Sequence, residues 1–120
     1  MHTLLVLGGI MMFLAVALGA FGAHALKDKL TPDRMKNYQT GIQYQIAHGL
    51  GLLLLGTVQG DTVNTSQITV SGWLLTAGIV LFSGSLYVLS LTGIRKLGAI
   101  TPLGGLCFLA GWVLFIVAVV

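Results

Sequence analysis

Four long, uncharged and apolar stretches alternate with three short polar breaks along the chain of 120 residues. The stretches cover residues 3–26, 38–58, 70–92 and 102–120. A helix needs roughly 20 apolar residues to cross about 30 Å of hydrocarbon, and it satisfies its own backbone hydrogen bonds there. The pattern therefore predicts an all-α fold. Residues 1–120 should form a single integral membrane domain, an antiparallel up-and-down bundle of four transmembrane helices.

A Thr-Pro pair stands before two of these helices, at residues 31–32 and 101–102. Threonine is a favoured N-cap and proline is favoured at the first helical position, so each pair predicts a helix start. The second helix would then begin before its apolar part, because residues 33–45 are polar and amphipathic. We expect this section to lie at the membrane interface, with Tyr38 and Tyr44 at the depth of the lipid headgroups.

Small and polar residues recur at helical spacing within the stretches. A small residue at every fourth position lets another helix approach closely, and the first stretch has this ridge at Ala15, Gly19 and Ala23. The fourth stretch places three small residues on one face: Gly104, Cys107 and Gly111. The third stretch places four polar residues on one face: Thr76, Ser83, Tyr87 and Ser90. We expect Trp73 of the same stretch to anchor the outer membrane interface.

Charged residues make up only 8% of the chain, whereas soluble domains are about 25% charged. The basic residues of the first break are Lys27, Lys29, Arg34 and Lys36, those of the third are Arg95 and Lys96, and the second holds only Asp61. Basic loops stay in the cytoplasm. We therefore expect a multi-pass protein of the cytoplasmic membrane with both termini outside. Its basic residues are too scattered for a nucleic-acid-binding face, so no nucleic-acid partner is expected.

His48 is the residue that most invites a functional hypothesis, because about ten residues, or ~15 Å of helix, separate it from the outer end of the second span. Ionisable groups near the membrane centre are rare and often functional. Three interpretations stay open. A neutral imidazole could bridge helices through hydrogen bonds to Tyr87, Ser83 or a backbone carbonyl. It could instead relay protons or bind a substrate, or ligate a haem or a metal. His24 should lie at the inner boundary, bordering the basic turn.

The spans lack the groups that several classes of membrane protein require. They contain no Asp or Glu, which disfavours cation-coupled carriers and small multidrug exporters, since both hold their cation with a buried acid. Ser83 and Ser90 have no base and acid in a triad-like pattern. The single cysteine, Cys107, cannot form an intrachain disulfide or a cysteine-based metal site. We therefore expect a protein that is not an enzyme and holds no cofactor or metal.

Several segments resemble a known family. They are residues 19–27, 44–50, 82–87 with 91–93, and 101–105 with 111–112. Their order and content resemble the small bacterial membrane proteins grouped as domain of unknown function 423, relatives of the eukaryotic transmembrane protein 256 group. The resemblance implies four helices in the cytoplasmic membrane and supplies no activity. It also marks a family-typical polar set: His24, Lys27, Tyr44, Gln45, His48, Ser83, Ser85, Tyr87, Thr101 and Pro102.

Three functional hypotheses follow. The first is a non-enzymatic bundle that self-associates or joins a larger membrane complex as an accessory subunit. The second is a small oligomeric channel or transporter lined by a candidate polar cluster: His24, Tyr44, Gln45, His48, Ser83 and Tyr87. The third is a protein that binds anionic lipid headgroups through the basic turn: Lys27, Lys29, Arg34 and Lys36. Membrane lipids are partners in every case.

Overall fold

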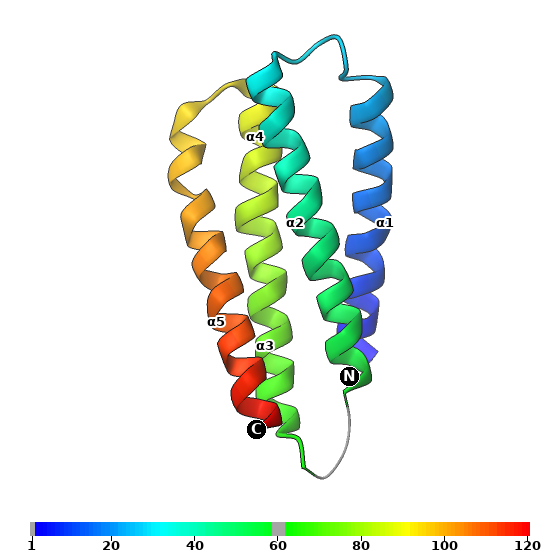
Figure 1. Ribbon diagram of the computed structural model, residues 1–120, viewed down its shortest axis with the longest axis vertical. Helices are drawn as coiled ribbons and strands as arrows, with labels where there is room; N and C mark the ends of the chain where they lie inside the picture. Colours follow the sequence, from blue (N-terminus) through cyan, green and yellow to red (C-terminus); the bar gives the residue numbers. More distant parts are fainter. Residues whose placement is uncertain (1, 59–61) are drawn as a thin grey trace.

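The computed structural model describes residues 2–58 and 62–120, and that part of the chain is helical without a strand. The elements are α1 (His2–His24), α2 (Pro32–Thr57), α3 (Thr65–Gly78), the π-helix η1 (Ile79–Ser83), α4 (Gly84–Thr92), the 3₁₀-helix η2 (Arg95–Ala99) and α5 (Thr101–Val119). α3, η1 and α4 follow one another as a single long rod (Figure 1). The all-α prediction is confirmed. The polar break at Asp61 lies outside the described residues.

Three helical segments are long and apolar enough to cross a membrane: His2–His24, Thr65–Thr92 and Arg95–Val119. The second predicted span, residues 38–58, is not among them, because polar side chains interrupt the apolar residues of α2. Several of these side chains, Tyr38, Gln45 and His48 among them, are buried inside the protein. A helix of mixed polarity is tolerated in a membrane when its polar groups face protein rather than lipid. α2 thus completes a four-helix bundle with the three apolar helices.

The bundle is flattened, with extents of 52 × 26 × 17 Å. Figure 1 shows the helices in the order α1, α2, the α3–α4 rod and α5, with α1 and α5 at opposite edges. α1 packs mainly against α2, and α5 packs mainly against α3. The two termini lie at one end, and the 25–31 and 93–100 connections lie at the other. This confirms the antiparallel up-and-down order.

The two Thr-Pro pairs start their helices differently. Thr31 caps α2, since its hydroxyl oxygen accepts a hydrogen bond from the Arg34 backbone N–H at 3.3 Å. At α5 the N-cap position belongs to Ile100, and no side chain caps it. Thr101 is already helical and its hydroxyl pairs with Ser85 at 2.6 Å instead. The predicted start of the fourth helix is confirmed, whereas the predicted threonine cap is wrong there because that hydroxyl is used between helices.

Only part of the small-residue ridge predicted on α1 contacts another helix of this chain. The buried residues of this helix are Leu4, Gly8, Ala15 and Gly22. Gly8 packs on Leu53 and Gly22 packs on Tyr38, both of α2. Of the predicted ridge, Ala15 is buried and Ala23 is exposed, and a Cβ added at Gly19 would meet only Ile42 of another helix, at 3.9 Å. The contact line therefore repeats every seven residues, as in left-handed helix packing, rather than every four as in the closer right-handed crossing.

The face predicted on α5 is confirmed for its two glycines, which are buried, while Cys107 is half-buried. Gly104 lies against the backbone and Cβ of Phe82, and Gly111 lies 2.8 Å, measured from an ideal Cβ, from Leu75. On the opposite helix Gly78 lies against Phe108 in the same way. We call Gly78, Gly104 and Gly111 with these partners the glycine seam. It joins α5 to the α3–α4 rod.

The aromatic residues predicted at the membrane interface differ in exposure. Trp73 and Tyr44 are 50% and 43% exposed, so both reach the surface of the bundle. Tyr38 is only 2% exposed. Its hydroxyl donates a hydrogen bond to the backbone carbonyl of Leu18 on α1. Tyr38 is therefore directed into the protein and not toward lipid, because its hydroxyl finds its partner on α1.

Candidate functional site

Gln45 of α2 links three helices through hydrogen bonds. Its amide Nε2 donates to the backbone carbonyl of Met11 on α1 at 2.8 Å. Its carbonyl Oε1 accepts from the hydroxyl of Tyr87 on α4 at 2.6 Å. The side chain is only 2% exposed. A buried amide with both ends paired in this way holds α1, α2 and α4 in register, because a shift of any helix leaves a polar group without a partner.

Ser83 and Tyr87 extend this contact toward the basic end of α2. The Ser83 hydroxyl donates to the Gly41 carbonyl at 2.7 Å. The Tyr87 ring packs on Gly41, where an added Cβ would lie 2.7 Å from its Cε1, and it lies 5.4 Å from the Tyr38 ring between centroids. We call Tyr38, Gln45, Ser83 and Tyr87 the polar seam. The structure thus brings together three members of the predicted cluster: Gln45, Ser83 and Tyr87.

The other two polar residues predicted on the face of Ser83 do not bridge helices. Thr76 and Ser90 are buried and donate to carbonyls of their own rod, those of Gly72 and Leu86. A hydroxyl satisfied within its own helix can face apolar neighbours at little cost. Their burial agrees with the predicted face, but their hydrogen bonds do not contribute to the polar seam.

His48 lies on a different side of α2 from the polar seam. Its Nδ1 is 2.8 Å from the Tyr44 carbonyl, one turn earlier in the same helix. Its ring stacks on Phe108 of α5 with centroids 3.6 Å apart and planes 10° apart. This hydrogen bond stays within α2, and Ser83 and Tyr87 bond to other groups, so the predicted hydrogen-bonded bridge from His48 to another helix is wrong. Because a carbonyl only accepts, a neutral imidazole here carries its hydrogen on Nδ1 and keeps a lone pair on Nε2.

Tyr44 belongs to the side of His48, since its ring lies 4.5 Å from Phe82 and 6.1 Å from His48 between centroids. Together with parts of α5 these rings line a shallow, mostly apolar groove of about 410 Å³ between α2 and α5. A second groove, of about 270 Å³, runs between α1 and the α3–α4 rod and includes Gln45 and Tyr87. We call these the α2–α5 groove and the α1–α4 groove.

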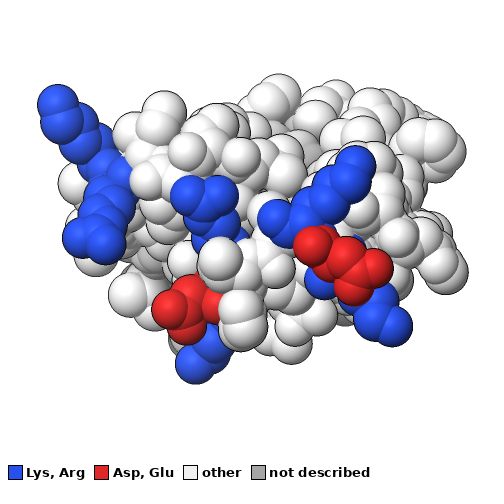
Figure 2. Space-filling model, turned by 90° about the horizontal axis from the view of Figure 1, so that it is seen from above, with Lys and Arg blue, Asp and Glu red and all other residues white. Residues whose placement is uncertain are grey.

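His24 does not join the predicted cluster. It is exposed in the last turn of α1, at the end of the bundle where the basic residues gather. Lys27, Lys29 and Lys36 are exposed there, and Arg34 is half-buried. Figure 2 views this end and shows Lys and Arg side chains spread across it. All six basic residues of the chain therefore lie at one end of the molecule.

Two further side-chain hydrogen bonds, which the sequence did not predict, also join helices. Ser71 of α3 is fully buried and donates to the Gly111 carbonyl of α5 at 2.6 Å. Ser85, known at first only as a family-typical residue, pairs with Thr101. A lone serine in an apolar span was the available signal for Ser71. It was not enough, because a backbone carbonyl as partner leaves no trace in the sequence.

The described residues contain no group of three His, Cys, Asp or Glu side chains close enough to hold a metal ion. His48 is accompanied by aromatic rings, which offer stacking and no further ligand. The arrangement can hold helices together, present two grooves toward the membrane and gather positive charge at one end.

Comparison with known proteins identifies the family. The model of the family described as "Protein of unknown function (DUF423)" matches residues 18–105. The chain belongs to the DUF423 family. It is 48% identical to the UPF0382 membrane protein YwdK of Bacillus subtilis, over 100% of this chain and 98% of that protein. It is also 48% identical to a UPF0382 membrane protein of Staphylococcus epidermidis, over 98% of this chain and 95% of the relative.

No solved structure matches the chain. The family assignment confirms the resemblance drawn from residues 19–27, 44–50, 82–87 and 101–105. The names of the relatives state that they are membrane proteins. Together with the three long apolar helices, this makes the chain a multi-pass membrane protein of the same kind.

Proposed function

We propose that the protein is a non-enzymatic membrane module that self-associates by packing helices of neighbouring copies into its two grooves. One observation carries the proposal. Gly105 lines the α2–α5 groove and Gly84 lines the α1–α4 groove, and a Cβ added at either would meet no atom within 4 Å. The glycines of the glycine seam, in contrast, all touch a neighbouring helix.

Glycine inside a helix is unfavourable unless something requires its small size. Neither Gly84 nor Gly105 has a positive φ, so backbone geometry does not require it. In membranes, glycine and other small residues serve close helix contacts, since lipid tails supply no hydrophobic drive between helices. An outward-facing glycine in each groove therefore fits a contact with a helix that this chain does not itself provide.

A conduction pathway lined by the predicted cluster has less support. Within one chain, the side chains of Gln45, Ser83 and Tyr87 in the polar seam already form hydrogen bonds with neighbouring helices. A pore needs such groups free to replace the hydration shell of a solute. A liposome flux assay comparing wild type with His48→Ala tests this alternative, and a flux that depends on His48 would favour it.

For orientation we infer that the protein lies in the cytoplasmic membrane with its basic end inside and both termini outside. The support is the concentration of every Lys and Arg at one end. Labelling of single cysteines placed at Lys29 and at Thr62, in a Cys107→Ala background, tests it. A membrane-impermeant reagent applied to intact cells should reach position 62 and spare position 29, and the reverse pattern would contradict the assignment.

Self-association is tested with Gly84→Leu and Gly105→Leu, each of which fills a groove. Wild type should form a defined oligomer by native mass spectrometry in mild detergent and by cross-linking in native membranes, and each variant should lose it. Val113→Leu is the matched control, because Val113 lies on α5 and is 60% exposed. A wild type that is monomeric by both methods would refute the proposal. If the wild-type protein is found bound only to a different protein and never to a second copy, self-association is refuted and an accessory role is favoured.

A further inference from the structure

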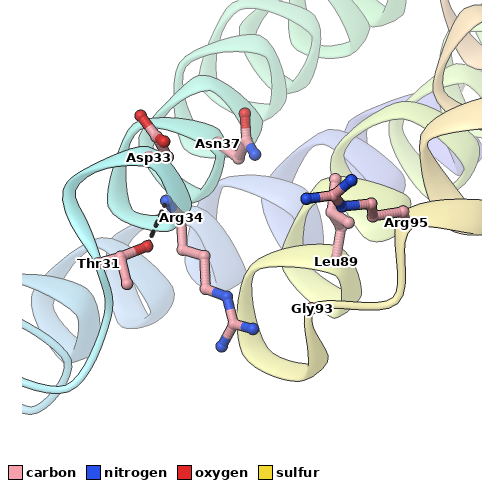
Figure 3. A pocket seen from close by; sticks show the side chains of 7 residues that line it. All are labelled: Thr31, Asp33, Arg34, Asn37, Leu89, Gly93 and Arg95. Carbon is pink, nitrogen blue, oxygen red and sulfur yellow. Dashed lines mark hydrogen bonds between the residues drawn. The ribbon is translucent and has the colours of Figure 1, made fainter.

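A hollow at the basic end brings together residues from two distant parts of the chain. It has a volume of about 350 Å³ and lies between the start of α2 and the connection from α4 to η2. Thr31, Arg34 and Asn37 line it from α2 and its cap, and Leu89, Gly93 and Arg95 line it from the other side. Figure 3 shows Arg34 reaching toward Gly93 and Arg95 reaching back toward α2. The two guanidinium groups thus come to the hollow from different parts of the chain, α2 and η2.

The position of Arg34 is set by the backbone of the opposite wall. Gly93 ends α4 with a φ of 74°, a left-handed conformation that favours glycine. The Arg34 guanidinium occupies the space where a side chain at position 93 would begin. The absence of a side chain there therefore lets a half-buried arginine lie against the end of α4. Lys27 and Lys29, by comparison, are exposed on the 25–31 connection.

The electrostatic balance of the hollow favours an anion. Asp33 is the one acidic residue that lines it, against two arginines. Figure 3 shows the Asp33 side chain directed away from the Arg34 guanidinium. The Asn37 amide adds a donor, and the Thr31 hydroxyl keeps a hydrogen to donate, because its oxygen serves as the acceptor for Arg34 N. Guanidinium groups present several N–H donors in a planar fork that suits phosphate oxygens.

We propose that this hollow binds a phosphate group, either the phosphodiester of an anionic lipid headgroup or a free phosphate. The hollow lies at a helix end, where headgroups meet a membrane protein, and the same helix carries exposed apolar residues, Val88 and Leu91 among them. The volume falls at the lower end of the range of small-ligand pockets, which suits one headgroup. The proposal differs from a diffuse basic surface, because it assigns binding to Arg34 and Arg95 and not to the lysines.

The test measures retention of lipid by native mass spectrometry after reconstitution in mixed phosphatidylglycerol and phosphatidylcholine bilayers. The variants are Arg34→Gln, Arg95→Gln and the two combined. Lys27→Gln combined with Lys29→Gln is the matched control, with the same loss of charge at the same end. Arg34→Lys keeps the charge without the planar fork and reports on folding if Arg34→Gln is unstable. A parallel arm measures thermal stabilisation of the detergent-solubilised protein by inorganic phosphate alone.

We expect each arginine variant to lower phosphatidylglycerol retention by about fivefold and the combined variant by more than tenfold, with little change in the lysine control. That result identifies a lipid headgroup. Stabilisation by inorganic phosphate that is lost in Arg34→Gln and Arg95→Gln, without selective lipid retention, identifies free phosphate at the same site. Equal losses in the arginine and lysine pairs would overturn the proposal, as would the absence of any response to either ligand. These outcomes are independent of the oligomeric state.

Discussion

The polar seam and the glycine seam both hold neighbouring helices together, but through different interactions. Around α2, side-chain amides and hydroxyls pair across three helices, as Gln45 does with Met11 and Tyr87. Around α5, the helices meet through glycines that admit Phe82, Leu75 and Phe108 to close contact. Two side-chain hydrogen bonds between helices, Ser71 to Gly111 and Ser85 with Thr101, accompany the glycine seam. In a membrane, neither seam gains from the hydrophobic effect, because lipid tails are as apolar as the side chains that pack between helices.

The difference follows from the composition of each helix. α5 is largely apolar, so close van der Waals packing is the main interaction that distinguishes a neighbouring helix from lipid tails. α2 carries polar groups that lipid cannot satisfy, so their pairing fixes its place among its neighbours. The stability of the two seams should therefore depend on different properties of the side chains, volume in the glycine seam and polarity in the polar seam. Substitutions that add a methyl group should damage the glycine seam, and substitutions that remove a hydrogen bond should damage the polar seam.

Gly104→Ala should have the largest effect, because the added Cβ would meet the backbone of Phe82 as well as its Cβ at 2.7 Å. A backbone clash cannot be relieved by a side-chain rotation, so the helices must separate, at a cost of about 2–3 kcal/mol in the free energy of unfolding. Unfolding by denaturing detergent in bicelles measures it. Gly9→Ala is the matched control, at an exposed position of α1 with no atom within 4 Å of an added Cβ, and it should change the stability by less than about 0.5 kcal/mol. Equal effects at the two positions would contradict the glycine seam.

Gln45→Leu should have the next largest effect, since it removes two hydrogen bonds between helices and strands the Tyr87 hydroxyl. We expect a loss of about 1–2 kcal/mol in the free energy of unfolding. Gln43→Leu makes the same chemical change at an exposed position of the same helix and should be nearly neutral.

A double-mutant cycle of Gln45→Leu with Tyr87→Phe sharpens this result. Because the two side chains share one hydrogen bond, their effects should add to more than the effect of the double variant. Strict additivity would show that the pair contributes nothing beyond packing.

His48→Phe should have the smallest effect, within about 0.5 kcal/mol, because a phenyl ring keeps the stack on Phe108 and the lost hydrogen bond lies within one helix. His48→Ala removes the stack and should cost about 1 kcal/mol more. The same unfolding assay compares them. If His48→Phe is instead as damaging as His48→Ala, the imidazole nitrogens matter and the packing interpretation fails.

Much of the candidate site could be predicted because buried polar residues in an apolar chain are few. Ser83 and Tyr87 were selected from type and spacing, and Gln45 as a family-typical polar neighbour of His48, and the structure places the three together. His24 was selected on type alone and lies elsewhere. The ridge on α1 was assigned a four-residue repeat, although the contacts follow the seven-residue repeat of Gly8, Ala15 and Gly22. A run of small residues is compatible with either repeat, and only the way α1 packs against α2 shows which of the two repeats makes the contacts.

The sequence by itself determined the number of helices, their alternating direction and the end that carries the positive charge. These properties depend on length, hydropathy and loop composition, which are local. Only the tertiary structure decided which polar groups meet, because four bridging side chains bond to backbone carbonyls, at Met11, Leu18, Gly41 and Gly111. Every residue has such a carbonyl, so no residue type marks the partner. The rotation and register of neighbouring helices select it, and a one-dimensional pattern does not contain them.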